Sequence, residues 1–173
     1  MTRRYLVTGD RVALRRPSAR DTDEFTRRAA ESRALHHPWM EPPDSPELFA
    51  AYLRRCRRRD MHGFFVHERS SGRLCGFVNI SNVVGGVFQS GYLGYAAFAG
   101  AAGQGYLSEG VTLVVRYAFD SLGLHRLEAN VQPTNAASLR LVERCGFRRE
   151  GYSPDYLFID GAWRDHERWA ITR

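Results

Sequence analysis

The pattern of apolar and polar positions at the start of the chain predicts a strand followed by a helix. Within residues 11–15, Val12 and Leu14 alternate with Arg11, Ala13 and Arg15, and this period of two is typical of a half-buried strand. Pro17 and Ser18 end the strand and provide a helix cap. We therefore expect a helix to follow, as far as about residue 32.

A second helix is predicted after a segment broken by prolines at positions 38, 42 and 43. Ser45 provides its cap, and apolar residues then recur at helical spacing. The residues on that face are Leu48, Ala51, Tyr52 and Cys56. The arginine-rich run 54–59 ends the helix.

The middle of the chain reads as a series of antiparallel strands. Residues 63–68 and 74–80 are apolar stretches separated by a short polar loop, which predicts a hairpin. Gly85 and Gly86 predict a second hairpin turn, because glycine adopts positive φ at both central positions of a tight turn without steric cost. The next strand should end near Phe98.

The carboxy-terminal part predicts two helices and three strands. Residues 105–119 have helical periodicity, 127–131 resume a strand, and a helix capped by Asn135 stops at Gly146. Two last strands flank Asp160-Gly161, a strong hairpin signal. This order of elements predicts an α+β fold with one sheet and helices on both of its faces.

Composition narrows the class of protein. A chain of 173 residues, 43% apolar and 25% charged, predicts a single globular domain over residues 1–173. The three cysteines are widely spaced and have no C-x-x-C pattern, which disfavours both a disulfide framework and a metal site. Arg3 and Arg4 precede no apolar signal segment, and no apolar run approaches the roughly 18 residues of a membrane span. We expect a cytoplasmic protein without a membrane partner.

The distribution of charge points to the middle of the chain. The net charge is +6, and all 25 basic residues are arginine, a bias that weakens a nucleic-acid interpretation although a basic surface still favours anionic partners. Only Arg69, Arg73 and Arg116 lie between Asp60 and His125. This uncharged region should be buried or face a ligand.

A glycine-rich segment, residues 103–108, joins a predicted strand to a predicted helix. Backbone N–H groups at a helix start have no helical partners and attract anions, and glycine lets a phosphate approach closely. The segment does not complete the dinucleotide-binding pattern, because Ser108 stands where the third glycine belongs, and it lacks the P-loop lysine. Taken alone, it is equally typical of a tight turn.

A second segment, residues 135–147, carries Asn135, Ser138 and the Gly146-Phe147 stop. In isolation it describes a capped amphipathic helix. The two segments in this order, a phosphate loop with its helix, one strand, then N-x-x-S-x-x-L followed by G-F, resemble the GNAT superfamily of acyl-CoA-dependent N-acetyltransferases.

Several further stretches resemble the RimJ-type ribosomal-protein-alanine N-acetyltransferases within that superfamily. They are residues 79–84, 92–95, 125–130, 150–152 and 155–166, with Pro38-Trp39 in the amino-terminal part. The resemblance implies the GNAT fold: a mixed, mostly antiparallel sheet with a V-shaped splay between the fourth and fifth predicted strands, which end near Phe98 and Val131. Acetyl-CoA would lie in this opening.

The resemblance also implies the residues that bind acetyl-CoA. The pantetheine would pair with the backbone of Ala96, Ala97 and Phe98, and the pyrophosphate would lie on the N–H groups of Gly103, Gln104, Gly105, Tyr106, Leu107 and Ser108. Family members usually carry Gln or Arg where this chain has Ala102, and Gly or Ala where it has Leu107. One side-chain contact to phosphate is therefore expected to be absent.

For catalysis, the resemblance implies an oxyanion donor at a backbone N–H near Ala97. Many GNAT enzymes place a tyrosine near the thiolate at the position of Val142, so this chain lacks that acid. Ser138 is the replacement that we predict, although it is equally typical of a surface helix serine. Asn135 is expected to orient the pantetheine and to cap its helix.

The general base is not singled out by any spacing. An α-amine titrates near pH 8 and can lose its proton to water, so a dedicated base is not compulsory. Glu109 and Glu128 are candidates, but they better suit structural roles, Glu109 beside a helix dipole and Glu128 beside a cross-strand arginine. The acceptor side should be lined by residues among Trp39, Tyr92, Tyr95, Tyr152 and Asp165, although aromatic residues at strand spacing also belong in cores.

The predicted function is transfer of an acetyl group from acetyl-CoA to a primary amine by direct attack in a ternary complex. The expected acceptor is the N-terminal alanine α-amine of a small-subunit ribosomal protein, with no direct nucleic-acid contact required and with a monomer or homodimer as the active form. One alternative is a small-molecule amine, such as an antibiotic, a polyamine or a metabolite. Another is a non-catalytic RNA- or ribosome-binding module, suggested by the arginines at 54–59.

Overall fold

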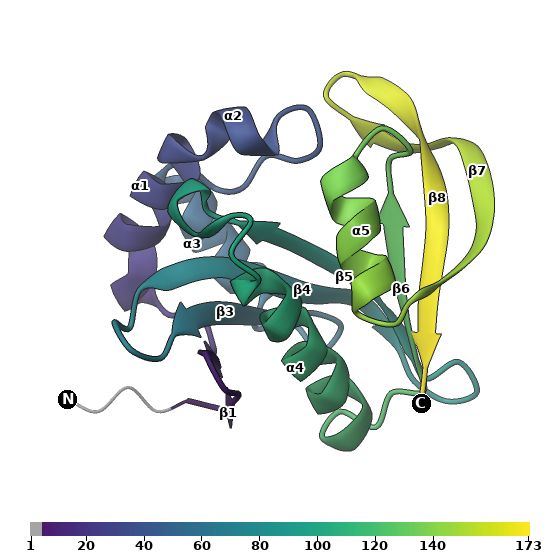
Figure 1. The fold of residues 1–173 in the computed structure, drawn as a ribbon, viewed down its shortest axis with the longest axis horizontal. Helices are drawn as coiled ribbons and strands as arrows, with labels where there is room; N and C mark the ends of the chain where they lie inside the picture. The colour runs from purple at the N-terminus through teal and green to yellow at the C-terminus, as the bar shows by residue number, and fades with distance from the viewer. Residues whose placement is uncertain (1–4) are drawn as a thin grey trace.

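The computed structural model describes residues 5–173, so Arg3 and Arg4 of the segment considered for targeting lie outside the described residues. The strands are β1 (Val7–Thr8), β2 (Val12–Arg15), β3 (His62–Glu68), β4 (Leu74–Val84), β5 (Ser90–Ala97), β6 (Arg126–Val131), β7 (Arg148–Ile159) and β8 (Ala162–Thr172). The helices are α1 (Thr22–Glu31), α2 (Arg33–His36), α3 (Pro46–Arg55), α4 (Tyr106–Asp120) and α5 (Ala136–Arg144), with short 3-10 turns at Ala19–Asp21 and Ala99–Ala101. Figure 1 shows their arrangement. None of the helices in the described part of the chain is long and apolar enough to span a membrane.

All eight strands form one sheet in the order β1-β2-β3-β4-β5-β6-β8-β7. Every neighbouring pair is antiparallel except β5 and β6, which run parallel. The predicted mixed, mostly antiparallel sheet is confirmed. Strand β1 was not predicted, because a strand of two residues is too short to show alternation.

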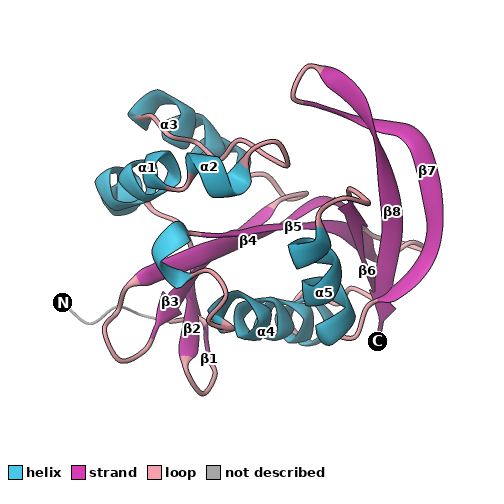
Figure 2. Cartoon of the chain, turned by 45° about the horizontal axis from the view of Figure 1, so that its top comes forward, coloured by secondary structure: helices cyan, strands magenta, loops and turns pink. Residues whose placement is uncertain are grey.

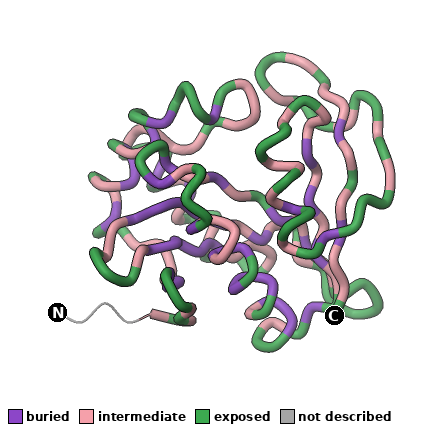
Figure 3. The backbone as a smooth tube through the Cα atoms, viewed as in Figure 1, coloured by how far each residue is buried: buried purple, intermediate pink, exposed green. Residues whose placement is uncertain are grey.

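Helices cover both faces of the sheet, as predicted. Figure 2 shows α1, α2 and α3 on one side and α4 and α5 on the other. One apolar core lies between the sheet and α4 and α5, and includes Val111, Val114 and Val142. A second core, which includes Phe25 and Phe49, lies under α1 and α3. Figure 3 shows that buried residues concentrate in the central strands, while many loop residues and the outer sides of the helices are exposed.

The helix ends predicted at Ser45, Asn135 and Gly146 are confirmed. Ser45 Oγ accepts a hydrogen bond of 3.3 Å from the Leu48 N–H at the start of α3. Asn135 Oδ1 accepts one of 3.1 Å from the Ser138 N–H at the start of α5. Gly146, just past α5, has a φ of +86°, the left-handed conformation that favours glycine at this position.

Of the two hairpin turns predicted at a specific pair of residues, one is confirmed and the other is wrong. Asp160 and Gly161 have φ values of +52° and +72° and form a two-residue turn between β7 and β8. Between β4 and β5, only Gly86 of the glycine pair has positive φ, and residues 85–89 form a longer loop. The physical reason is Gln89, whose carbonyl accepts hydrogen bonds from the N–H groups of His125 (2.7 Å) and residue 126 (3.1 Å). The longer loop thereby holds the start of β6 beside β5.

The parallel pair of strands separates soon after it begins. The paired residues of β5 and β6 end at Tyr92 and Glu128, whereas β5 continues to Ala97 and β6 to Val131. Beyond that point β5 stays bonded to β4 on its other side, and β6 to β8. The splay predicted between the fourth and fifth strands is therefore confirmed; these strands are β5 and β6 because β1 comes before them.

Candidate active site

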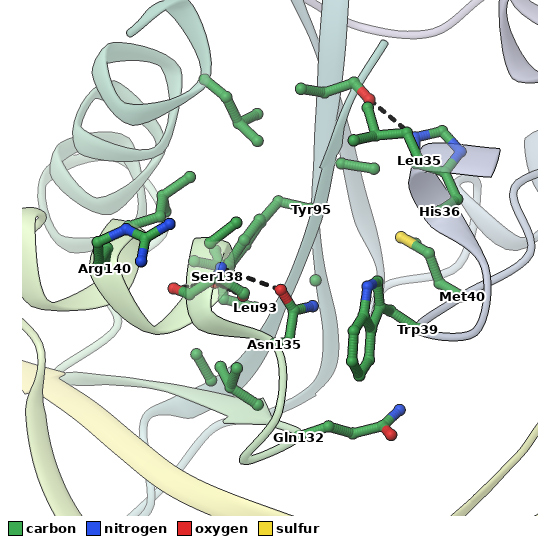
Figure 4. Close-up of a pocket in the computed structure, with 18 of the residues that line it drawn as sticks. Leu35, His36, Trp39, Met40, Leu93, Tyr95, Gln132, Asn135, Ser138 and Arg140 are labelled. Atoms are coloured by element: carbon green, nitrogen blue, oxygen red, sulfur yellow. Dashed lines mark hydrogen bonds between the residues drawn. The ribbon is translucent and has the colours of Figure 1, made fainter. Parts of the chain in front are cut away.

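A cavity of about 530 Å³ occupies the splay. Its walls come from β5, β6, the loop before α4, the exposed side of α5, the segment around α2, and the β7–β8 hairpin. Figure 4 shows Tyr95, Ser138 and Asn135 on one side of the cavity, with His36, Trp39 and Met40 on the other. These two groups come from opposite faces of the sheet, so the opening passes through it.

The glycine-rich loop forms one end of the cavity. Gly103 and Gly105 have φ values of +74° and +83°, and an added Cβ at Gly103 would meet no atom within 4 Å. Gly105 is the N-cap of the 15-residue helix α4. The N–H groups of the first helical turn therefore have no helical partners, and with the positive end of the helix they can bind an anion.

Not all six residues of the predicted pyrophosphate segment line the cavity. Gly103, Gly105, Leu107 and Ser108 do, but Gln104 and Tyr106 are absent from its lining. The Gln104 side-chain amide donates to the residue 100 carbonyl at 3.1 Å. The Tyr106 hydroxyl donates to the Glu68 carboxylate at 2.5 Å, and the Arg11 guanidinium lies over its ring. The side chains of Gln104 and Tyr106 therefore support the loop from the side away from the cavity.

Two arginines that the sequence analysis did not select line the same end of the cavity. Arg140 and Arg144 lie one turn apart on α5, are exposed, and form no hydrogen bond or ion pair with any of the residues 5–173. Ala102, where a side-chain contact to phosphate is expected to be absent, lines the same cavity, so the two guanidinium groups are candidates to replace that contact. The signal in the sequence was their i, i+4 spacing, which puts both on one helix face.

The end of β5 directs selected backbone groups into the splay. The Phe98 N–H donates to the Cys75 carbonyl of the β4 side at 2.9 Å. Because hydrogen-bonded positions alternate along an antiparallel pair, the backbone of Ala96 also faces β4, whereas that of Ala97 faces the splay. Ala96 and Ala97 line the cavity, and Phe98 is buried outside it.

The carbonyl of Ala97 is already bonded. His36 Nε2 donates to it at 2.7 Å, while Ser32 Oγ accepts from the Ala99 N–H at 2.9 Å. Burial lowers the pKa of His36, against the opposing effect of the hydrogen bond to Ala97. The neutral ring and the serine thus hold the end of β5, which leaves the Ala97 N–H directed into the splay as a candidate oxyanion donor.

Ser138 projects into the cavity from the first turn of α5 and has a partner that the sequence analysis placed elsewhere. The Tyr95 hydroxyl lies 2.6 Å from Ser138 Oγ. Burial raises the pKa of Tyr95 well above its ordinary value, with the hydrogen bond to Ser138 opposing this effect. The phenol therefore stays protonated, and it can donate to Ser138 Oγ and leave the serine proton free for another acceptor.

The opposite end of the cavity is mainly apolar. Leu35, Trp39 and Met40 face Leu157 and Ile159 of the β7–β8 hairpin. The two walls also meet at their rims, where His37 Nε2 lies 3.4 Å from Asp160 Oδ2. This end can accept a small apolar group beside the reacting atoms.

Some predicted acceptor-side residues lie outside the cavity lining. Tyr152 is 46% exposed and its hydroxyl donates to Asp165, so both side chains are engaged with each other on β7 and β8. Tyr92 is also absent from the lining, and burial, followed by the charge of Glu128, raises its pKa. Of the four aromatic residues in this group, the structure brings together only Trp39 and Tyr95.

The two glutamates considered as bases do not line the cavity either. Glu109 Oε1 accepts the N–H groups of Arg11 (2.9 Å) and Val12 (3.2 Å), and so fastens α4 to the turn between β1 and β2. Glu128 accepts from Arg126 of its own strand at 2.8 Å, rather than from an arginine of a neighbouring strand. Both carboxylates thus have structural partners.

The donor groups suit an acylated phosphopantetheine. Free backbone groups of β5 can pair with its amides, the loop N–H groups and two arginines can hold its phosphates, and Ser138 lies deeper in the splay. Such an arrangement defines an acyl-CoA-dependent transferase. The profile of the acetyltransferase (GNAT) domain family matches residues 11–148, and the chain belongs to this family.

Three proteins of known name or structure show what the chain is similar to. It is 35% identical to the [ribosomal protein uS5]-alanine N-acetyltransferase of Escherichia coli (strain K12) over 96% of this chain and 90% of that protein. Mycobacterium smegmatis RimJ in complex with CoA-disulfide superposes with a TM-score of 0.86 at 28% identity, covering 93% of this chain and 81% of that one. Spermidine N-acetyltransferase from Vibrio cholerae, in complex with CoA and spermine, shares the fold with a TM-score of 0.80 at 23% identity, over 94% and 95% of the two chains. The protein is an N-acetyltransferase that uses acetyl-CoA.

Proposed function

We propose that the protein acetylates the N-terminal alanine α-amine of a ribosomal protein of the small subunit, in a ternary complex with acetyl-CoA. The observation that carries the proposal is the 35% identity with the uS5-alanine enzyme over nearly the whole of both chains. The active form is a cytoplasmic monomer or homodimer.

The lining of the cavity supports a chain terminus over a polyamine. Within the described residues, no aspartate or glutamate lines the cavity, whereas two unpaired arginines do. A polyamine carries several positive charges and would find no carboxylate there to offset their desolvation. The alanine methyl group, in contrast, suits the apolar end formed around Trp39 and Met40.

The residues of the splay can be assigned to the steps of the reaction. We propose that the N–H groups of residues 103–108 and the guanidinium groups of Arg140 and Arg144 hold the phosphates, and that Asn135 orients the pantetheine. Acetyl-CoA supplies the activated acyl group as a thioester. The Ala97 N–H donates to the oxygen that gains negative charge during attack. Ser138 Oγ, oriented by Tyr95, donates a hydrogen bond to the sulfur as it leaves.

The proposal is tested by incubating the purified protein with acetyl-CoA and a synthetic peptide that carries the amino-terminal sequence of an alanine-initiated ribosomal protein. We expect release of free thiol together with the mass of one acetyl group on the peptide. A matched peptide with a blocked N-terminus should stay unmodified, and spermine should react much more slowly. Faster transfer to spermine than to the peptide would refute the proposed acceptor.

The non-catalytic alternative is not retained, because the chain belongs to an enzyme family. The arginines at 54–59 suggested it; of these, Arg54 and Arg55 end α3, and together with Arg58 they line a second cavity of about 760 Å³. A comparison of ribosomal-protein N-termini from cells with and without the gene extends the test to the natural acceptor. Unchanged alanine-initiated termini would contradict the proposal.

A further inference from the structure

An amine acceptor reaches the enzyme largely as an ammonium ion, because an α-amine has a pKa of about 8. Attack on the thioester requires the nitrogen lone pair, so a proton must be removed first. In the described part of the chain, no carboxylate lines the cavity, and the imidazoles of His36 and His166 are the side chains in its wall that can accept a proton near neutral pH. The further inference rests on the proposed function only in that the acceptor is a primary amine.

Neither ring nitrogen of His36 is available to accept a proton from the acceptor. Its Nε2 carries a hydrogen that is donated to the Ala97 carbonyl at 2.7 Å. Its other nitrogen, Nδ1, is shut off from solvent and has no hydrogen-bond partner within the described residues. His36 therefore positions the end of β5, and no lone pair of its ring is accessible to an acceptor.

His166 has the complementary arrangement. It lies on β8, is only 2% exposed, and lines the cavity. Its Nδ1 lies 2.9 Å from the carbonyl oxygen of Arg164, so this nitrogen must carry the hydrogen. The lone pair is left on Nε2, which has no hydrogen-bond partner among residues 5–173 and, unlike His36 Nδ1, is not fully enclosed.

Strand geometry places His166 on the side of the sheet from which an acceptor enters. Trp169 and Ile171 of β8 pack against the core formed with α4 and α5, and side chains alternate along a strand. His166 therefore points to the opposite face, as does Asn130 on the adjacent strand β6, whose neighbours belong to that core. Ser138 approaches the cavity from the α5 side. The imidazole and the serine hydroxyl thus lie on opposite sides of the splay.

Asn130 adds a second acceptor group beside His166. Its Oδ1 is buried without a hydrogen-bond partner in the described structure, and the residue lines the cavity. Asn130 of β6 is paired with Arg168 of β8. Arg168 lies two residues after His166, so the side chains of Asn130 and His166 lie on the same face of the sheet. An unpaired buried carbonyl oxygen is costly unless a ligand donates to it, and an amine has the hydrogens to do so.

The surroundings of His166 keep its ring neutral. The side chain of Tyr156 on β7 packs edge-on against it, with ring centroids 6.1 Å apart. On β8 it is flanked by Asp165 and Glu167, with Arg164 and Arg168 two residues away on either side, and His36 faces the same cavity from the α2 segment. Burial lowers the pKa of His166, against the opposing effects of the hydrogen bond to Arg164 and the charge of Asp165.

We propose that His166 is the general base, whose Nε2 takes the proton from the acceptor ammonium while Asn130 Oδ1 holds a second hydrogen of the same nitrogen. The N–H bond breaks and its electron pair stays on the amine nitrogen. That pair forms the bond to the acetyl carbonyl carbon while the C=O pair moves onto oxygen, and its return breaks the C–S bond, whose pair leaves on sulfur. The second proton that the nitrogen loses passes to the thiolate by way of the Ser138 hydroxyl, and His166 releases its proton to solvent.

The test compares the wild-type chain with His166→Asn. An asparagine amide can still donate to the Arg164 carbonyl, but it offers no basic nitrogen. With an alanine-initiated peptide near pH 7 we expect kcat/KM to fall about 100-fold. The difference should narrow as the pH rises through the pKa of the amine, since the substrate then deprotonates without help. His125→Gln, an exposed histidine outside the cavity, is the matched control and should retain full activity.

A second acceptor distinguishes a role of His166 in proton removal from a purely structural role. A peptide that ends in an aminooxy group is uncharged at neutral pH and needs no base before attack. With this acceptor, His166→Asn should lie within about threefold of wild type, which a merely structural defect would not produce. His166→Gln provides a second variant should the asparagine protein fail to fold, and calorimetry with CoA checks that the donor site is intact in both.

Two results would overturn the assignment of His166: a loss of less than about threefold with the peptide, or an equal loss with the peptide and the aminooxy acceptor. Failure of the proposed acceptor is recognised separately, in the wild-type protein. A wild-type chain that acetylates spermine in preference to the peptide contradicts the proposed acceptor, and the same two comparisons, made with spermine, then decide the role of His166.

Discussion

Replacing Tyr95 by phenylalanine removes a single oxygen atom from the wall of the cavity. That oxygen lies 2.6 Å from Ser138 Oγ, and the tyrosine keeps its proton at neutral pH because burial raises its pKa. The phenol can therefore donate to Ser138 Oγ, and in that arrangement it fixes the direction of the serine proton. A net hydrogen bond contributes about 1 kcal/mol, which corresponds to roughly a fivefold change in rate if it acts only in the transition state.

We expect Tyr95→Phe to lower kcat about fivefold to tenfold and to leave KM for acetyl-CoA nearly unchanged. Ser138→Ala should lower kcat about 100-fold. The double variant should be no slower than Ser138→Ala, since the phenol acts through the serine, and the coupling energy between the two substitutions should then be about 1 kcal/mol. Tyr5→Phe, near the opposite edge of the sheet, is the control.

The assay is release of free thiol at saturating acetyl-CoA and peptide, with thermal unfolding measured on each variant. Additivity of the two substitutions to within about 0.5 kcal/mol would refute the reasoning, because it would mean that Tyr95 acts independently of Ser138. A fall in unfolding temperature without any change in kcat would refute it as well.

Three further substitutions test the frame of the site. Asn135→Ala should lower the free energy of unfolding by about 1 kcal/mol through loss of the helix cap, and should raise KM for acetyl-CoA; denaturant titration and steady-state kinetics check the two effects. Gly76→Ala places a Cβ in steric conflict with the Ala96 carbonyl oxygen, so β5 must shift; we expect roughly 1–3 kcal/mol lower stability and weaker CoA binding by calorimetry. Burial raises the pKa of Asp21, but hydrogen bonds, led by that from Arg15, outweigh it and hold the pKa below 3.8. The stabilisation is present above the unfolded pKa and is lost as the pH falls through the lower folded value, so Asp21→Asn should cost about 3 kcal/mol at neutral pH and flatten the acid side of the stability profile.

Much of the fold is predictable because its signals are local. The caps at Ser45 and Asn135, the Asp160-Gly161 turn and the helix after the glycine loop each depend on a few adjacent residues, and the structure confirms all four. The prediction of a tight turn at Gly85-Gly86 was wrong, because the hydrogen bonds of Gln89 with the start of β6, which is distant in the sequence, decide the length of the loop.

The site was less predictable, because its geometry depends on which side of a strand each group faces. The sequence places Tyr95 among the acceptor-side aromatics, yet strand alternation and the packing of α5 bring it to Ser138. His166 lies in a stretch that resembles the family, but the sequence does not show which of its ring nitrogens is accessible: that follows from the hydrogen bond to the Arg164 carbonyl and from the separation of β5 and β6. The arginines at 140 and 144 were visible as a spaced pair, but only the folded chain shows that they border the splay.

Because β5 and β6 separate, the folding stability of the enzyme should depend on the concentration of its coenzyme. Past Tyr92 and Glu128 the two strands are not hydrogen-bonded to each other, so under the proposed binding mode a pantetheine chain would complete hydrogen bonding that the protein alone leaves open. A ligand that binds only the folded chain stabilises it by about 2.7 kcal/mol at a concentration 100 times its Kd. When the cell is short of the coenzyme, the protein is expected to open more often and to be degraded faster, so its abundance would follow the acetyl donor that it consumes.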